Sequence, residues 1–200
     1  MLLGDWYHTL FTTNAESLQE DVGRPGLSSF IPALFSEVKN EHNIQHNIAN
    51  LGPEKIKMIF NVVRLLLLLI AAYLFGKPFA RSKNETQMFY EISVVLLLTP
   101  LVFPHQGKYA LLLFMPAYAL LIKETIQHRA FGWPEKKFKH ITLLALLIIS
   151  IALITFTTDG LIGMKASEIT QHLHLLTYGA FALFMAICFI KPEEIKNNPN

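Results

Sequence analysis

The chain has 200 residues, of which 52% are hydrophobic and only 16% are charged. Long runs of Leu, Ile, Val and Phe with this composition exclude an ordinary soluble domain and indicate an integral membrane protein. The formal net charge of +2 is too small to indicate a nucleic-acid partner, so none is expected. Cys188 is the only cysteine and lies in an apolar run, so no disulfide can form within one chain.

The first 56 residues are mostly polar, and we predict that they form an outer-face segment (1–56) ahead of a transmembrane helical bundle (57–200). The start of the chain lacks a basic region and carries Asp5 within its apolar stretch, so a cleavable signal peptide is not expected. Further along, helical spacing of apolar residues predicts a short amphipathic helix, lying in the interface or packed on the bundle. These residues are Leu27, Phe30, Ile31, Leu34 and Phe35. Ser28 or Ser29 is expected to cap this helix.

Five apolar segments follow, and each predicts a membrane helix. They are 57–75, 88–103, 109–122, 141–158 and 172–190. The second and third are short against the ~20 residues that a perpendicular span needs. They meet at a polar break, 104–108, around which Pro100, Pro104, Pro116 and Gly107 should make the helices kink or stop. The predicted fold class is therefore an all-α, polytopic bundle of about five transmembrane helices with a kinked or broken central hairpin.

The distribution of basic residues predicts the orientation of these spans. The loops KPFARSKNETQ and KETIQHRAFGWPEKKFKH carry most of the Lys and Arg, whereas the central break and the connection DGLIGMKASEITQ carry one Lys each. Because short basic loops stay in the cytoplasm, the central break and the first 56 residues should face outward. Backbone at this depth must be buried in protein or line a cavity, since hydrocarbon offers no hydrogen-bond partners.

Two places carry candidate binding residues. Arg64 lies inside the apolar run VVRLLLLLIAAYLF, where a charge costs ~2.5 to 3.5 kcal/mol on insertion scales. It is either a ligand for an anionic phosphate or a structural or snorkelling residue. In the break, His105, Gln106 and Lys108 can donate hydrogen bonds to an anion or a sugar hydroxyl. The alternative for the break is a simple interhelical turn with Tyr109 as an interfacial anchor.

Other polar residues are less informative. His42 and His46 have the spacing of a two-histidine metal site, but no third ligand is identifiable, and we predict no metal site. His172 and His174 fall on different helix faces and are interpreted as interfacial histidines. Several carboxylates predicted to be outside could act as a general base, although the sequence does not select among them. They are Asp5, Glu16, Glu20, Asp21 and Asp159.

Three stretches within residues 23–122 suggest a family: GRPGLSSFIPALFSE, NLGPEKIKMIFNVVRLLLLL and YEISVVLLLTPLVFPHQGKYALLLFMPAYALL. Together they resemble the carboxyl-terminal half of the glycosyltransferases of family 87, which belong to the GT-C class. The matching features are the residues 26–29 before an apolar helix, an arginine within the next helix at Arg64, and a break running from Pro100 to His105. The last two spans match only as hydrophobic helices.

The resemblance implies a glycosyltransferase of the bacterial inner (plasma) membrane. Such an enzyme moves a hexose, mannose or pentose from a polyprenyl-phosphate sugar to a glycan or glycolipid acceptor on the outer face, without any cofactor beyond the lipid-linked donor. The substrate-binding residues implied here are His105, Arg64, Gln106, Lys108 and Tyr109. The general base of the class lies in the first outer loop, so the resemblance places it upstream, as in a truncated carboxyl-terminal portion.

Two other functions are compatible with the sequence. The main alternative is a non-enzymatic multi-span scaffold or accessory subunit of an envelope complex. A transporter is less favoured, because transporters distribute charged residues through several spans. Among the charged residues of this chain, only Arg64 and the edge residue Glu91 qualify.

Overall fold

The structure is a computed structural model, and it describes residues 26–37, 47–75, 85–103, 108–130 and 137–190. All regular elements in these ranges are helices. They are α3 (Leu27–Phe35), α4 (Pro53–Phe75), α5 (Glu85–Val102), the 3-10 helix η1 (Lys108–Phe114), α6 (Met115–Ala130), α7 (Lys137–Thr155), α8 (Asp159–Ile162), α9 (Met164–His172) and α10 (Leu175–Cys188). The predicted all-α class is therefore confirmed for the described ranges, which contain no strand.

Two helical stretches are long and apolar enough to cross a membrane. One is α4, and the other is Tyr109–Ile126, which joins η1 to most of α6. A third candidate is the pair α9 and α10, which bends by 60° at a short break. The apolar part of α7, Ile141–Thr155, is shorter than a span, and α5 is not among the candidates. Two or three candidate spans indicate a membrane protein, whereas five spans stay a prediction.

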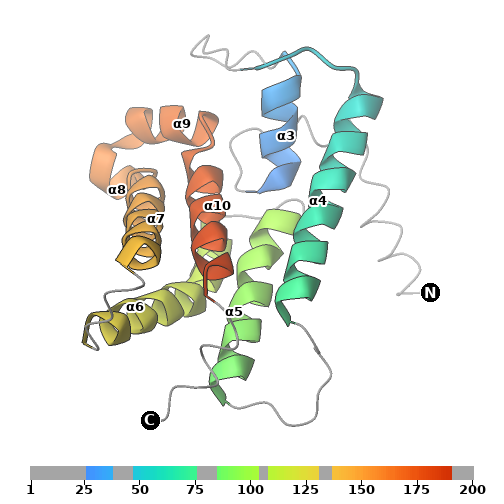
Figure 1. The fold of residues 1–200 in the computed structure, drawn as a ribbon. Coiled ribbons are helices and arrows are strands. Elements are labelled where there is room, and N and C mark those ends of the chain that lie inside the picture. Colours follow the sequence, from blue (N-terminus) through green and yellow to red (C-terminus); the bar gives the residue numbers. More distant parts are fainter. Residues whose placement is uncertain (1–25, 38–46, 76–84, 104–107, 131–136, 191–200) are drawn as a thin grey trace, which may run out of the picture.

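The helices pack around a core that α5, α6, α7 and α10 share. Tyr90, Leu97, Leu120 and Leu183 are completely buried there. Figure 1 shows α4, α5, α7 and α10 running roughly alongside one another, with α8 and α9 across the upper end of α7 and α10. The helix α5 ends beside the middle of α4, directly below α3 (Figure 1). The C-terminal end of α5 is therefore level with the middle of α4, the longest helix.

The helix α3 confirms a short helix over the predicted residues, and it packs on the bundle, which was one of the two placements expected for it. Every residue from Leu27 to Ala33 is buried. The predicted serine cap is wrong: Gly26 is the N-cap, and no side chain caps the helix. The reason is that α3 begins against α5, where a Cβ on Gly26 would lie 2.7 Å from the Pro100 carbonyl oxygen. Only glycine fits that contact without a shift of the backbone.

A small residue also lets α7 and α10 approach closely, as is common between membrane helices. A Cβ on Gly179 of α10 would lie 2.8 Å from Ile154 Cγ1 and 3.3 Å from the Ser150 carbonyl oxygen. Ser150 Oγ donates a hydrogen bond to the Gly179 carbonyl oxygen at 2.8 Å. Since that bond uses the Ser150 proton, Tyr118 of α6 donates to Ser150 Oγ at 2.7 Å. This chain of hydrogen bonds joins α6, α7 and α10.

Replacing Ser150 by alanine is therefore expected to lower the free energy of unfolding by roughly 0.6 to 1.7 kcal/mol, the range measured for such bonds in membrane helices. Thermal unfolding of the purified protein in detergent measures the change. The matched control is Thr142→Val, because the Thr142 hydroxyl bonds only the Phe138 carbonyl of its own helix, at 3.0 Å. If Ser150→Ala unfolds at the wild-type temperature, the three-helix connection contributes nothing to stability.

Candidate functional site

Arg64 lies midway along α4 on the stripe that faces the bundle. It shares this stripe with Ile56, Phe60, Leu67 and Ala71. Only 9% of the surface of Arg64 is exposed, so its side chain faces the other helices of the bundle. The guanidinium carbon lies 5.9 Å from the centroid of the Phe103 ring. Cation–π contacts of this kind contribute ~2 kcal/mol when they are desolvated.

Phe103 directly precedes the polar break. The helix α5 ends at Val102, the 3-10 helix η1 begins at Lys108, and α6 begins at Met115. The helix α5 thus ends just before the break, as predicted, whereas residues 104–107 lie outside the described part. Pro100 lies inside α5 and does not stop that helix. The physical cause of the end at Val102 is local, because proline has no N–H to donate and disfavours helical geometry in the residue before it. Arg64 therefore lies beside the residue from which the chain enters the break.

The structure describes only some of the predicted binding residues. His105 and Gln106 lie outside the described residues. Lys108 is the first residue of η1, but its side chain is also outside the described part. Tyr109 is 89% exposed, as suits an interfacial anchor better than a residue lining a pocket. Among these five residues, Arg64 is the one whose buried surroundings the structure describes.

The first turn of α3 also lies beside the end of α5. Its N-cap, Gly26, touches the Pro100 carbonyl oxygen, and Pro100 lies one turn before Phe103. The Gly26 N–H also donates to Thr177 Oγ1 of α10 at 3.3 Å. The N-terminal end of α3 therefore meets the C-terminal end of α5, which brings helix ends of opposite partial charge together.

The register of α3 against α4 puts Arg64 at the level of this turn. Two backbone hydrogen bonds, from Ile48 N–H to the Leu34 oxygen and from Leu51 N–H to the Phe35 oxygen, tie the end of α3 to the segment before α4. The chain runs back along α4 from there. At 1.5 Å per residue, α3 is about 13 Å long, and Arg64 lies about 16 Å from the start of α4. The two positions agree to about one helical turn.

Buried polar groups gather around this meeting point. They are Ser28, Ser29, His174 and Thr177, each at most 2% exposed. Ser29 Oγ donates to the Gly26 carbonyl oxygen at 3.3 Å. Ser28 Oγ is buried and has no hydrogen-bond partner in the described part of the chain. The sequence pattern did not predict that the Ser28 hydroxyl would be buried without a partner in the described part, because it identified the residue only as a potential cap.

The interfacial interpretation of His172 and His174 is wrong, since both residues are buried. His174 is the N-cap of α10 and adopts the left-handed conformation, with φ at 55°. Its ring lies 5.8 Å from the Phe30 ring in an edge-on arrangement. Helical spacing could not predict this burial, because it arises where α9 and α10 bend and α10 packs against α3.

Of the predicted acidic candidates, the structure describes Asp159, whose hydrogen bonds to Ser167 and Gln171 lie in α8 and α9 and not in this region. Asp159 accepts hydrogen bonds from Ser167 Oγ and, at 3.4 Å, from Gln171 Nε2, so it holds α8 to α9. The other four candidates, like His42 and His46, lie outside the described residues. Within the described ranges, no three His, Cys, Asp or Glu side chains lie close enough together to hold a metal ion.

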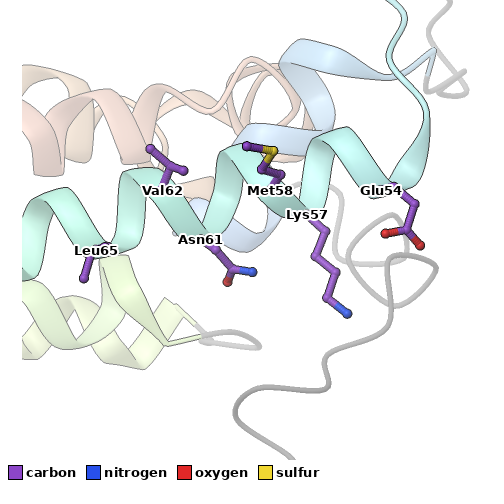
Figure 2. A pocket seen from close by; sticks show the side chains of 6 residues that line it. All are labelled: Glu54, Lys57, Met58, Asn61, Val62 and Leu65. Atoms are coloured by element: carbon purple, nitrogen blue, oxygen red, sulfur yellow. The ribbon is translucent and has the colours of Figure 1, made fainter.

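A surface depression of about 410 Å³ lies elsewhere, on a different face of α4 from the Arg64 stripe. Figure 2 shows the lining side chains, and all of them come from this one helix: Glu54, Lys57, Met58, Asn61, Val62 and Leu65. None is a predicted binding residue. We therefore take the meeting point of α3, α4 and α5 as the candidate site.

Comparisons of the chain with family models, with curated proteins and with solved structures give no match.

Proposed function

We propose that this chain is the membrane bundle of a GT-C type glycosyltransferase. It transfers a hexose, mannose or pentose from a polyprenyl-phosphate sugar to a glycan or glycolipid acceptor at the outer face of a bacterial inner membrane. The observation that carries the proposal is Arg64, a largely buried residue whose guanidinium lies beside Phe103, at the point where the chain enters the break that contains His105. Gly26 lies beside Pro100, and α4, which carries Arg64, contacts both α3 and α5, so the helices on which the resemblance rests adjoin one another.

The chemistry of the donor explains why a cation at this depth is useful. As the sugar–phosphate bond breaks and an acceptor oxygen attacks the anomeric carbon with inversion, the leaving polyprenyl phosphate gains negative charge. A guanidinium held in a water-poor site stabilises that charge more strongly than it could in water. The acceptor proton passes to a general base, which the resemblance places in the first outer loop of the class. In this proposal Arg64 and His105 contact the donor, Gln106 and Lys108 shape the pocket, and the exposed Tyr109 is an interfacial anchor beside it.

The arrangement of the helices supports a broken central hairpin within a five-span topology. Figure 1 shows α5 ending beside the middle of α4, so the break begins at the depth of Arg64. The start of α4 and the pair α8 and α9 lie toward one end of the bundle, which the distribution of basic residues assigns to the outside. In this topology α5 and α7 are also spans, and a lipid-linked donor reaches the site from the bilayer.

The direct test is sugar transfer by membranes of the natural host, in which the chromosomal copy carries His105→Ala. With a radiolabelled polyprenyl-phosphate sugar, we expect transfer to fall about a hundredfold, as for the loss of one transition-state donor. His128→Ala, at the predicted cytoplasmic end of α6, is the control and should keep wild-type transfer. Transfer at the wild-type rate by His105→Ala would refute the role of His105. If wild-type and deletion membranes transfer equally, the protein is the scaffold or accessory subunit instead.

A further inference from the structure

We infer that the first turn of α3 forms part of the phosphate site, and that the Ser28 hydroxyl donates a hydrogen bond to the phosphate that Arg64 binds. The inference rests on the proposed function, which it extends from α4 and the central break to α3. The proposed ligand is a phosphate ester or a phosphate ion, held between a guanidinium and a helix N-terminus.

The first observation is the state of the Ser28 hydroxyl. The residue is 2% exposed, and its Oγ has no hydrogen-bond partner among the described residues. A buried hydroxyl normally has a partner, because desolvation without a hydrogen bond is unfavourable. The neighbouring Ser29 shows the ordinary arrangement, since its Oγ donates to the Gly26 carbonyl oxygen. Ser28 is thus a donor in place for an acceptor that the described residues do not supply.

The second observation is the direction of that side chain. Phe30 packs on α10, with its ring centroid 5.1 Å from that of Tyr178 and 5.9 Å from that of Phe181. Two residues correspond to about 200° of rotation around a helix, so Ser28 faces away from α10. Within the described ranges, α3 otherwise packs mainly against α4 and α5. Because Cβ atoms lean toward the helix N-terminus, the hydroxyl is directed toward the end of α3 that meets Pro100.

The third observation is the electrostatic character of this end of α3. The helix has nine residues, carries no acidic residue in its first turn and has no side-chain cap. Its first-turn N–H groups therefore have no carboxylate or capping side chain against them and can donate to an anion, although the C-terminal end of α5 lies beside the N-cap. Arg64 lies at the same level on α4, and its guanidinium supplies the full charge. A serine hydroxyl, backbone N–H groups and a guanidinium together are donors suited to phosphate oxygens.

The test measures phosphate binding by the purified chain in nanodiscs of neutral phosphatidylcholine. One arm titrates decaprenyl phosphate and the other titrates inorganic phosphate, so that a lipid source and a free ion are distinguished. For Ser28→Ala we expect about tenfold weaker binding in the arm that binds, the usual loss for one hydrogen bond to a charged group. The unliganded variant should unfold at or above the wild-type temperature, because the hydroxyl that is removed has no partner among the described residues.

Ser29→Ala is the matched control, since Ser29 is equally buried in the same turn but already bonds Gly26. It should change phosphate affinity by less than about twofold, because its hydroxyl is directed to the backbone. Wild-type affinity in Ser28→Ala, or an unfolding temperature below wild type without ligand, would overturn the inference. If Arg64→Leu loses binding while Ser28→Ala keeps it, the proposed function survives and only the role of Ser28 fails. Absence of binding to either probe by the wild-type chain would count against both.

Discussion

Replacing Arg64 by leucine is expected to lower sugar transfer by at least about a hundredfold, while the protein still inserts into the membrane. Leucine keeps the apolar volume of the side chain and removes the charge that is costly at this depth, so insertion should not suffer. Transfer falls because the leaving phosphate loses its main source of positive charge. The measurement is transfer from a polyprenyl-phosphate sugar, normalised to the amount of protein in host membranes.

Two further variants of α4 make this result specific. Arg64→Lys keeps the charge but loses the planar fork of donors, and we expect transfer between that of the wild type and that of Arg64→Leu. Asn61→Leu removes a polar group from the exposed face of α4, three residues away, and should leave transfer unchanged. If Arg64→Leu transfers sugar at the wild-type rate, Arg64 has a structural role, and the site loses the observation that supports it.

Replacing Gly26 by alanine is expected to lower the free energy of unfolding by about 3 kcal/mol or more. The backbone at Gly26 has φ at 120° and ψ at 172°, a conformation that is essentially restricted to glycine. Strain of this kind costs ~1 to 3 kcal/mol in other residues. In addition, the new Cβ would lie 2.7 Å from the Pro100 carbonyl oxygen, which is backbone and can move only if α3 and α5 separate. Chemical or thermal unfolding in detergent measures the loss.

Two glycines elsewhere in the chain separate these two costs. Gly163 has φ at 80° and open space around it, so Gly163→Ala reports the conformational strain alone. Gly160 has open space and no positive φ, so Gly160→Ala should have little effect. The excess of Gly26→Ala over Gly163→Ala then measures the contact between α3 and α5. Equal losses in these two variants would show that α3 does not begin against α5.

Several features of the fold follow from local sequence. The run that contains Arg64 predicts a long apolar helix, and α4 is such a helix. Pro104 and Gly107 predict an interruption, and α5 ends just before it. The spacing of apolar residues from Leu27 to Phe35 predicts the helix α3. These predictions succeed because helical periodicity and the effects of proline depend on residues close together in the chain.

Other features were predicted wrongly or not at all. Ser28 and Ser29 have the residue type of a helix cap, but Gly26 occupies that position because α5 lies against it. His172 and His174 have the polarity of interfacial residues, yet both are buried where α9 and α10 bend. Each error has the same origin, since the neighbours that decide the outcome come from distant parts of the sequence.

By itself, the sequence determined that this is a helical membrane protein with a charge at depth in its longest apolar helix. Composition and periodicity suffice for that conclusion, because the cost of placing a charge in hydrocarbon depends on one residue and its own helix. The tertiary structure alone decided that Arg64 lies beside Phe103 and that the first turn of α3, with the buried Ser28 hydroxyl, meets the end of α5. Whether a buried donor has a partner depends on how separate helices pack, and that packing is not encoded in any single stretch of the chain.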